Sequence, residues 1–184
     1  MGALPIDRTR SPSVLILCTG NAARSVMVGY MLGYLSEVSG TDLLVATAGT
    51  HVVEGQPMGR RTRAGLAAIE ELAAAPVSRH RSRQVAEADL ERATLVVAME
   101  AAHVRYVRRS HPGAAPRTVT LRRLCRELSP PPGSLVDRVA ALGAAEVQLT
   151  DDEEVADPAG LEEDAYVACA LELWALCQAL IARL

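Results

Sequence analysis

Residues 13–25 carry the strongest structural signal in the chain and read Ser13-Val14-Leu15-Ile16-Leu17-Cys18-Thr19-Gly20-Asn21-Ala22-Ala23-Arg24-Ser25. The apolar run at 14–17 predicts a buried strand, and the loop at 18–25 leads from that strand into a helical pattern. Such a loop lies at the carboxyl end of its strand, where folds built from alternating strands and helices place their ligand sites. The segment therefore predicts both a local structure and the position of a site.

The rest of the chain alternates between strand and helix patterns. Apolar residues recur at helical spacing after the loop, again between residues 66 and 72, and in a long C-terminal stripe. This alternation predicts an α/β fold, a three-layer sandwich in which a parallel sheet is flanked by helices on both faces. The predicted strands are 14–17, 43–46, 94–98 and a short one at 118–121.

The length of 184 residues suits one domain with a proper core. We expect residues 1–12 to form a flexible N-terminal tail and residues 13–184 to form the domain. A Ser-Pro-Pro-Pro-Gly stretch at 129–133 interrupts the helical pattern. We therefore interpret about 129–156 as an excursion from the domain that contains one short helix near 135–142.

Composition restricts the class of protein and its partners. With a net charge of −3 there is no reason to expect nucleic acid or an anionic membrane as a partner. No apolar run approaches the roughly 20 residues that span a bilayer, and no secretory signal is visible, so we expect a cytoplasmic location. Cys18 apart, Cys125, Cys169 and Cys177 are expected to be buried free thiols, since no zinc-binding pattern includes them.

The loop at 18–25 combines a cysteine with an arginine in a Cys-x5-Arg spacing. Loop amides that lead into a helix form an anion-binding concavity, and its field favours the nucleophilic thiolate form of Cys18. Arg24 can present two N–H donors to phosphoryl oxygens. We expect Gly20 to allow a tight turn, Asn21 to brace the loop at left-handed backbone angles, and Ser25 to donate to the thiolate. The candidate phosphate-binding residues are Thr19, Gly20, Asn21, Ala22, Ala23, Arg24 and Ser25.

The residues of this loop allow two other interpretations. A Cys-x5-Arg spacing also arises by chance, and a lone cysteine is more often buried than catalytic. The strand–loop–helix context favours the functional interpretation. A nucleotide-binding loop of the GxxxxGK[ST] type is excluded because the chain contains no lysine.

A reaction through a cysteinyl-phosphate also needs a general acid for the leaving group, which later serves as a base for water. Asp157 is the best candidate, since Pro158 stiffens the backbone just before the C-terminal helix. From the residues alone, Asp157 can equally begin a turn or cap that helix. Asp151 and Asp152 are rivals, but we interpret the acidic run at 151–154 as solvated surface.

Over about residues 13–184 the chain resembles the low-molecular-weight protein tyrosine phosphatases, a family that also contains arsenate reductases and protein-arginine phosphatases. The resemblance implies a four-stranded parallel sheet flanked by helices, with the phosphate-binding loop after the first strand and no metal or cofactor. It rests on Cys-Thr-Gly-Asn-x-x-Arg-Ser at 18–25, Thr-Ala-Gly-Thr-His at 47–51, His-Arg-Ser-Arg-Gln at 80–84, Val-Ala-Met at 97–99 and Asp-Pro at 157–158.

The resemblance also implies a role for each matching residue. Cys18 is the nucleophile, Arg24 holds the phosphate and Asp157 is the general acid. The expected activity is phosphomonoester hydrolysis, with protein phosphotyrosine as the favoured substrate and a cysteinyl-phosphate intermediate. The partner is a phosphorylated protein or a small aryl phosphate, and the chain is expected to be a monomer or weak homodimer. The residues that support the loop are Asn21, Ser25 and His80.

Three positions depart from the family pattern. Ala23 stands where many members have a second cysteine, Ala159 and Gly160 stand where tyrosine phosphatases have aromatic residues, and Ala22 replaces a bulkier side chain. A pocket without aromatic walls gains less from stacking a phenyl ring. The alternatives are therefore a protein-arginine phosphatase, an arsenate reductase, and a catalytically weak phosphate-binding module.

Overall fold

A computed structural model describes residues 11–184 and contains a four-stranded parallel sheet in the order β2-β1-β3-β4. The predicted fold class is confirmed. The strand β2 ends three residues later than predicted, because its last residues pair with the end of β1 in the register Cys18↔Gly49. The strands are β1 (Ser13–Cys18), β2 (Leu44–Gly49), β3 (Leu95–Ala98) and β4 (Thr118–Thr120).

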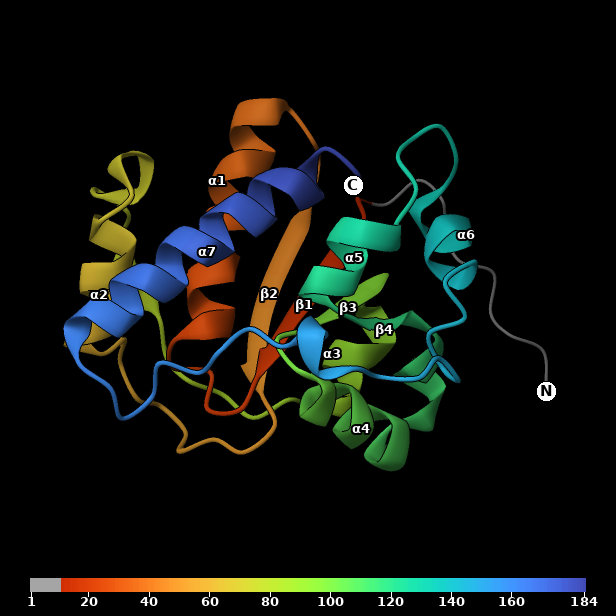
Figure 1. The fold of residues 1–184 in the computed structure, drawn as a ribbon, viewed down its shortest axis with the longest axis horizontal. Coiled ribbons are helices and arrows are strands. Elements are labelled where there is room, and N and C mark those ends of the chain that lie inside the picture. Colours follow the sequence, from red (N-terminus) through yellow and green to blue (C-terminus); the bar gives the residue numbers. More distant parts are fainter. Residues whose placement is uncertain (1–10) are drawn as a thin grey trace.

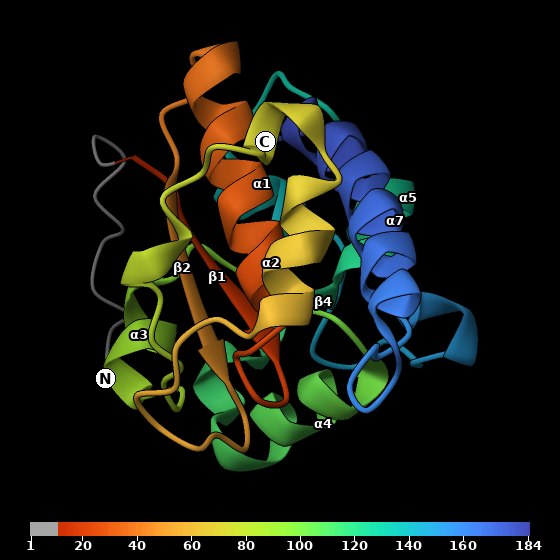
Figure 2. The same cartoon turned by 90° about the vertical axis from the view of Figure 1, so that its left-hand side faces the viewer.

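Helices cover both faces of this sheet, as Figures 1 and 2 show. The alternation of side chains along β1 explains why: Val14 and Ile16 belong to one buried cluster, while Leu15 and Leu17 belong to the other. The larger cluster is covered by α1 (Arg24–Ser39), α2 (Arg60–Ala67), α5 (Leu121–Glu127), α6 (Leu135–Ala140) and α7 (Glu163–Ile181), and the smaller by α3 (Glu87–Arg92) and α4 (Ala101–Ser110).

Among the described residues, the C-terminal helix α7 is long and apolar enough to cross a membrane by length and composition alone. Glu172 and Gln178 interrupt its apolar residues, so it is not a continuous apolar run. In the fold, α7 packs beside α1 and α2 (Figure 2) and buries the predicted stripe, including Cys169, Leu173 and Leu180. The burial of this stripe accounts for part of its apolar character.

Several boundaries differ from the sequence interpretation. The helical pattern at 66–72 divides into α2 and a 3-10 turn, Glu70–Leu72, because Ile69 between them is extended. Cys125 is only half-buried, since it faces the edge of α7 and donates to the carbonyl of Leu176 at 3.3 Å. The other 3-10 turns are Val77–Arg79, Pro112–Arg117 and Asp151–Glu153.

The expected tail and excursion can be placed only in part. Residues 1–10 of the tail lie outside the described residues, and the carbonyl of Pro12 accepts from the N–H of Leu44 at 2.9 Å. Within the excursion, Arg138 donates to the carbonyls of Ser129, at 2.7 Å, and of Arg183 near the C-terminus, at 2.5 Å. These bonds tie the start of the excursion to the end of the chain.

Candidate active site

The nucleophile candidate lies where β1 ends and the loop at 18–25 turns toward α1, which begins at Arg24. Cys18 is 3% exposed, and its Sγ lies 2.9 Å from the Oγ of Ser25. The unpaired N–H groups at the start of α1 give this end of the helix a partial positive charge. The geometry therefore places a hydroxyl donor beside the sulfur, as the sequence predicted.

Asn21 braces the loop from within. Its φ of 49° is left-handed, and its fully buried side chain donates to the Oγ of Ser25 at 3.1 Å and to the Oγ1 of Thr47 at 3.0 Å. Its Oδ1 accepts from the backbone N–H of Arg83 at 3.1 Å. One side chain thus connects the loop to β2 and to the segment after residue 79.

His80 supports the same residue from outside the loop. Its Nε2 lies 2.9 Å from the carbonyl oxygen of Asn21. Partial burial lowers the pKa of His80 below its usual range, while the bond to Asn21 opposes that shift. A neutral imidazole with Nε2 protonated can donate to this carbonyl. The sequence assignment of His80 to loop support therefore agrees with its contact.

The glycine that the loop requires is not the one that the sequence suggested. A Cβ at Gly20 would meet only the Cβ of Ala22 at 3.9 Å, which is an ordinary contact. A Cβ at Gly49 would lie 2.5 Å from the carbonyl oxygen of Thr19 and 2.8 Å from the nitrogen of Asn21. The tight position is therefore on β2, against which the loop packs, and the steric role assigned to Gly20 was wrong.

Arg24 is 1% exposed and its guanidinium is bound on several sides. Its NH1 donates to Glu100 Oε2 at 2.6 Å and to the carbonyl of Val155 at 3.0 Å, and its NH2 donates to Asp157 Oδ2. The structure thus brings Arg24 and Asp157 together from positions 133 residues apart. A guanidinium in this position is suited to bind the oxygens of a phosphoryl group.

Glu100 and His103, which the sequence analysis missed, form a polar pair beneath the loop. Glu100 directly precedes α4, and the Nε2 of His103 lies 3.0 Å from the Oγ1 of Thr19 and 3.5 Å from the Oε1 of Glu100. Burial, reinforced by the charge of Arg24, lowers the pKa of His103 to about 4, although Glu100 opposes the shift. His103 is therefore neutral near pH 7. A polar residue at the end of a parallel strand was the available signal for Glu100.

A pocket of about 390 Å³ opens above the loop and is lined by Cys18, Arg24 and Asp157. Small residues form part of its wall, since Ala22 and Ala159 contribute only methyl groups. Tyr166 of α7 is an aromatic residue in the lining, and it belongs to the long C-terminal stripe. The pocket therefore has an aromatic lining residue even though Ala159 and Gly160 directly follow Pro158.

Asp157 is positioned by a turn as well as by Arg24. Its Oδ1 accepts from the N–H of Ala159 at 3.1 Å, while the residue that precedes α7 is Glu162. Of the sequence alternatives, the turn and the pocket position both hold, and the helix cap does not. Asp151 and Asp152 do not line the pocket.

The remaining cysteines differ from Cys18 in their surroundings. Burial raises the pKa of Cys169 to about 12 and also raises the pKa of Cys125 and of Cys177. All four thiols are free. Among the described residues, no group of three or more His, Cys, Asp or Glu side chains is arranged to hold a metal ion.

Comparisons with known proteins agree with this geometry. A family model described as low molecular weight phosphotyrosine protein phosphatase matches residues 13–128. A low molecular weight protein tyrosine phosphatase from T. tengcongensis is 28% identical with a TM-score of 0.74, over 95% of this chain and 100% of that chain. The YwlE arginine phosphatase from Geobacillus stearothermophilus is 25% identical with a TM-score of 0.68, over 92% and 90%. No match was found among curated proteins.

The family match includes the loop, both strands beside it and the segment that holds His80. It covers well over half of the chain, and the T. tengcongensis structure extends the similarity over 95% of the chain. The chain therefore belongs to the low molecular weight phosphotyrosine protein phosphatase family.

Proposed function

We propose that the protein hydrolyses phosphotyrosine in proteins through a cysteinyl-phosphate intermediate. The observation that carries this proposal is the convergence of Cys18, Arg24 and Asp157 on one pocket. Together they supply the nucleophile, the phosphate clamp and the acid that in-line displacement at phosphorus needs.

In the first step the Cys18 thiolate attacks phosphorus, so that an S–P bond forms as the P–O bond to the leaving group breaks. The phosphoryl oxygens take the place of the Asp157 carboxylate on Arg24. Asp157 in its protonated form gives its proton to the leaving oxygen. In the second step water attacks phosphorus, Asp157 takes its proton, and the S–P bond breaks to restore the thiolate and release phosphate.

Tyr166 supports an aromatic substrate. It lines the same pocket as Cys18 and Arg24, and it also lines a neighbouring hollow with Arg60 and Arg61. A tyrosine face adds about 0.5–1.5 kcal/mol when it packs against another ring. Tyr166 therefore offers one aromatic wall in a family member whose Asp-Pro segment continues with Ala159 and Gly160.

A protein-arginine phosphatase is the second candidate, because the YwlE arginine phosphatase is 25% identical and similar over most of both chains. Ala22 and Ala159 leave room for a leaving group that is not aromatic. Ala22 nevertheless lacks a hydroxyl for a guanidinium. An arsenate reductase is disfavoured, because the buried Cys169 and Cys177 have raised pKa values and make poor relay thiols.

The test compares turnover of p-nitrophenyl phosphate by the wild type and by Cys18→Ser. We expect Cys18→Ser to lose at least about 1,000-fold in kcat, because the serine hydroxyl is not ionised at neutral pH. Cys125→Ser is the matched control, since its hydroxyl can keep the bond to the carbonyl of Leu176. Retained turnover in Cys18→Ser, or an equal loss in Cys125→Ser, would refute the proposal.

A second assay separates the two substrates. We expect the wild type to prefer phosphotyrosine peptides over phosphoarginine peptides in kcat/KM, and Tyr166→Ala to narrow that preference about threefold or more. A preference for phosphoarginine would establish the second candidate instead. We also propose a cytoplasmic location, which the four free thiols support because such thiols persist in reducing compartments.

A further inference from the structure

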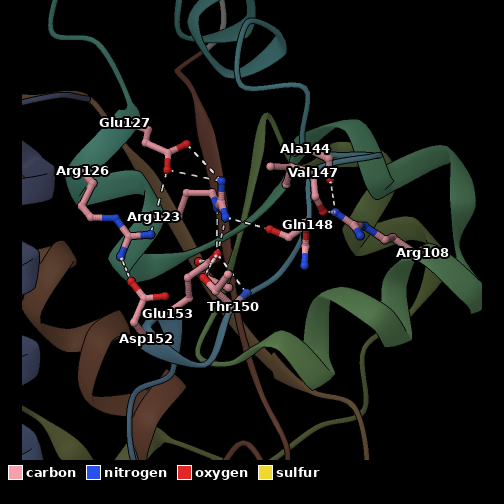
Figure 3. A network of polar contacts seen from close by, with 11 residues as sticks. Arg108, Arg123, Arg126, Glu127, Ala144, Val147, Gln148, Thr150, Asp152 and Glu153 are labelled. Atoms are coloured by element: carbon pink, nitrogen blue, oxygen red, sulfur yellow. Dashed lines mark hydrogen bonds and ion pairs between the residues drawn. The ribbon is translucent and has the colours of Figure 1, made fainter.

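Glu153 is buried, whereas the other residues of the acidic run at 151–154 are exposed. It is 0% exposed, which corrects the interpretation of 151–154 as solvated surface. Its Oε2 accepts from the Oγ1 of Thr120 at 2.6 Å and from the Nε of Arg123 at 3.0 Å. Figure 3 shows Glu153 beside Arg123 and Thr150. Its Oε1 accepts from the Oγ1 and N–H of Thr150, at 3.0 and 3.3 Å, and from the NH2 of Arg123.

Arg123 also binds the backbone that precedes Glu153. Its NH2 also donates to the carbonyl of Gln148 at 2.9 Å, and its NH1 lies 3.2 Å from a carboxylate oxygen of Glu127 (Figure 3). The hydrogen bonds from Arg123 and Thr120 lower the pKa of Glu153 to about 2 against the effect of burial. Glu153 is therefore an anion whose position is fixed by β4 and α5.

The next residues lead directly to the general acid. Two residues after Glu153, the N–H of Val155 donates to the carbonyl of Met99 at 2.9 Å, and the carbonyl of Val155 accepts from Arg24. Asp157 follows two residues later and contacts Arg24 as well. Three residues thus separate the buried carboxylate from Asp157, so a shift of Glu153 can be transmitted to Asp157 along a short piece of chain.

A buried ion pair is a poor device for stability alone. Taking both charges out of water costs several kcal/mol per ion, and an apolar pair of similar shape is often as stable. Directed hydrogen bonds, however, fix a segment in one place more sharply than apolar contacts do. Because several donors bind the carboxylate of Glu153, its role is to hold the segment that follows it in one position.

We propose that Glu153, held by Arg123 and Thr120, is a positioning residue that sets Asp157 over the pocket for proton transfer to the leaving group. The inference rests on the proposed role of Asp157 as the acid. Glu153 is not among the residues that line the pocket, so it acts through the backbone at 154–157.

The test uses Glu153→Gln, which keeps the shape and removes the charge, and measures kcat/KM for phenyl phosphate and for p-nitrophenyl phosphate, because kcat/KM does not include hydrolysis of the cysteinyl-phosphate that both substrates form. A poor leaving group such as phenolate needs the acid more than p-nitrophenolate does. We expect the ratio of the two kcat/KM values, phenyl over p-nitrophenyl, to fall about tenfold or more. A merely structural loss of active protein would lower both rates equally and leave this ratio unchanged.

Two further variants make the result decisive. Thr120→Val removes one hydrogen bond to Glu153 without removing a charge, so it should lower the same ratio by a smaller factor and remain folded. Asp152→Asn is the matched control, because the exposed carboxylate of Asp152 binds Arg126 at 2.7 Å, and Arg126 lies on α5 as Arg123 does. The ratio should not change in this variant. An unchanged ratio in both Glu153→Gln and Thr120→Val would overturn the inference.

A double-mutant cycle tests whether Glu153 acts through Asp157. In the Asp157→Asn background, Glu153→Gln should lower the ratio by less than twofold, because the acid that it positions is already absent. Additive effects would overturn the inference. If Asp157→Asn alone leaves the ratio unchanged, the acid role in the proposed function fails, and the positioning inference fails with it. If Asp157→Asn lowers the ratio and Glu153→Gln does not, only the positioning inference fails.

Discussion

Replacing Asn21 tests how much of the loop depends on one buried side chain. Asn21→Ala deletes the hydrogen bonds to Ser25, Thr47 and the N–H of Arg83. It also leaves an alanine at a φ of 49°, without the polar side chain that lets asparagine adopt left-handed backbone angles. A net value of about 1 kcal/mol for each of three hydrogen bonds and about 1 kcal/mol for the left-handed backbone gives a loss of about 4 kcal/mol. That is a large part of the 5–15 kcal/mol typical of a domain.

Urea unfolding followed by circular dichroism measures this loss, and kcat for p-nitrophenyl phosphate measures its effect on the site. Asn21→Gly is the matched variant, because it deletes the same hydrogen bonds but tolerates the left-handed backbone. We expect Asn21→Gly to be about 1 kcal/mol more stable than Asn21→Ala and both to turn over at least about tenfold more slowly than the wild type. A loss below about 1 kcal/mol in Asn21→Ala, or equal stability of the two variants, would refute the reasoning.

Two further predictions concern the neighbours of the loop. Gly49→Ala should destabilise the protein by about 1–3 kcal/mol and reduce kcat, because the new Cβ would lie 2.5 Å from the carbonyl oxygen of Thr19. Gly33→Ala on α1, where a Cβ meets nothing within 4 Å, should be neutral or stabilising in the same urea titration, and a similar loss in both variants would contradict the steric argument. Because the pKa of His103 is lowered to about 4 from an ordinary 6.5, its stabilising contribution is present above about pH 6.5 and is lost as the pH falls toward 4. His103→Gln should abolish this loss of stability at low pH. The difference in unfolding free energy between wild type and variant should therefore change by about 1.4 kcal/mol per pH unit in this range. If the unfolding free energies of the two proteins change equally with pH, His103 is not the source of the loss.

The fold and the centre of the site were predictable because their signals are local. The apolar run at 14–17 indicates a buried strand by itself. Cys18 and Arg24 belong to one short loop, so their spacing can be seen directly in the sequence. His80 required a resemblance, because nothing in its immediate neighbours shows that it reaches the loop. Asp157 was the best candidate for the acid because Pro158 follows it, but the residues alone left a turn or a helix cap equally open.

The missed features depend on contacts between distant segments. Glu153 is hidden in an acidic run, and only its meeting with Arg123, 30 residues earlier, buries it. Glu100 reaches Arg24 across 76 residues, so the sequence offered only its position after a strand. The same reason applies to Gly49. A side chain is excluded there because the loop that follows the neighbouring strand β1 packs against its Cα.

The strand order also has a consequence for the synthesis of this protein. The central strand β1 is made first, yet its two neighbours in the sheet are β2 and β3, so its pairing is complete only after residue 98 has left the ribosome. Asp157 and the helix α7, which packs on α1 and α2, follow still later. A nascent chain therefore carries Cys18 long before it carries a pocket, and we expect phosphatase activity to appear only as the last segments emerge.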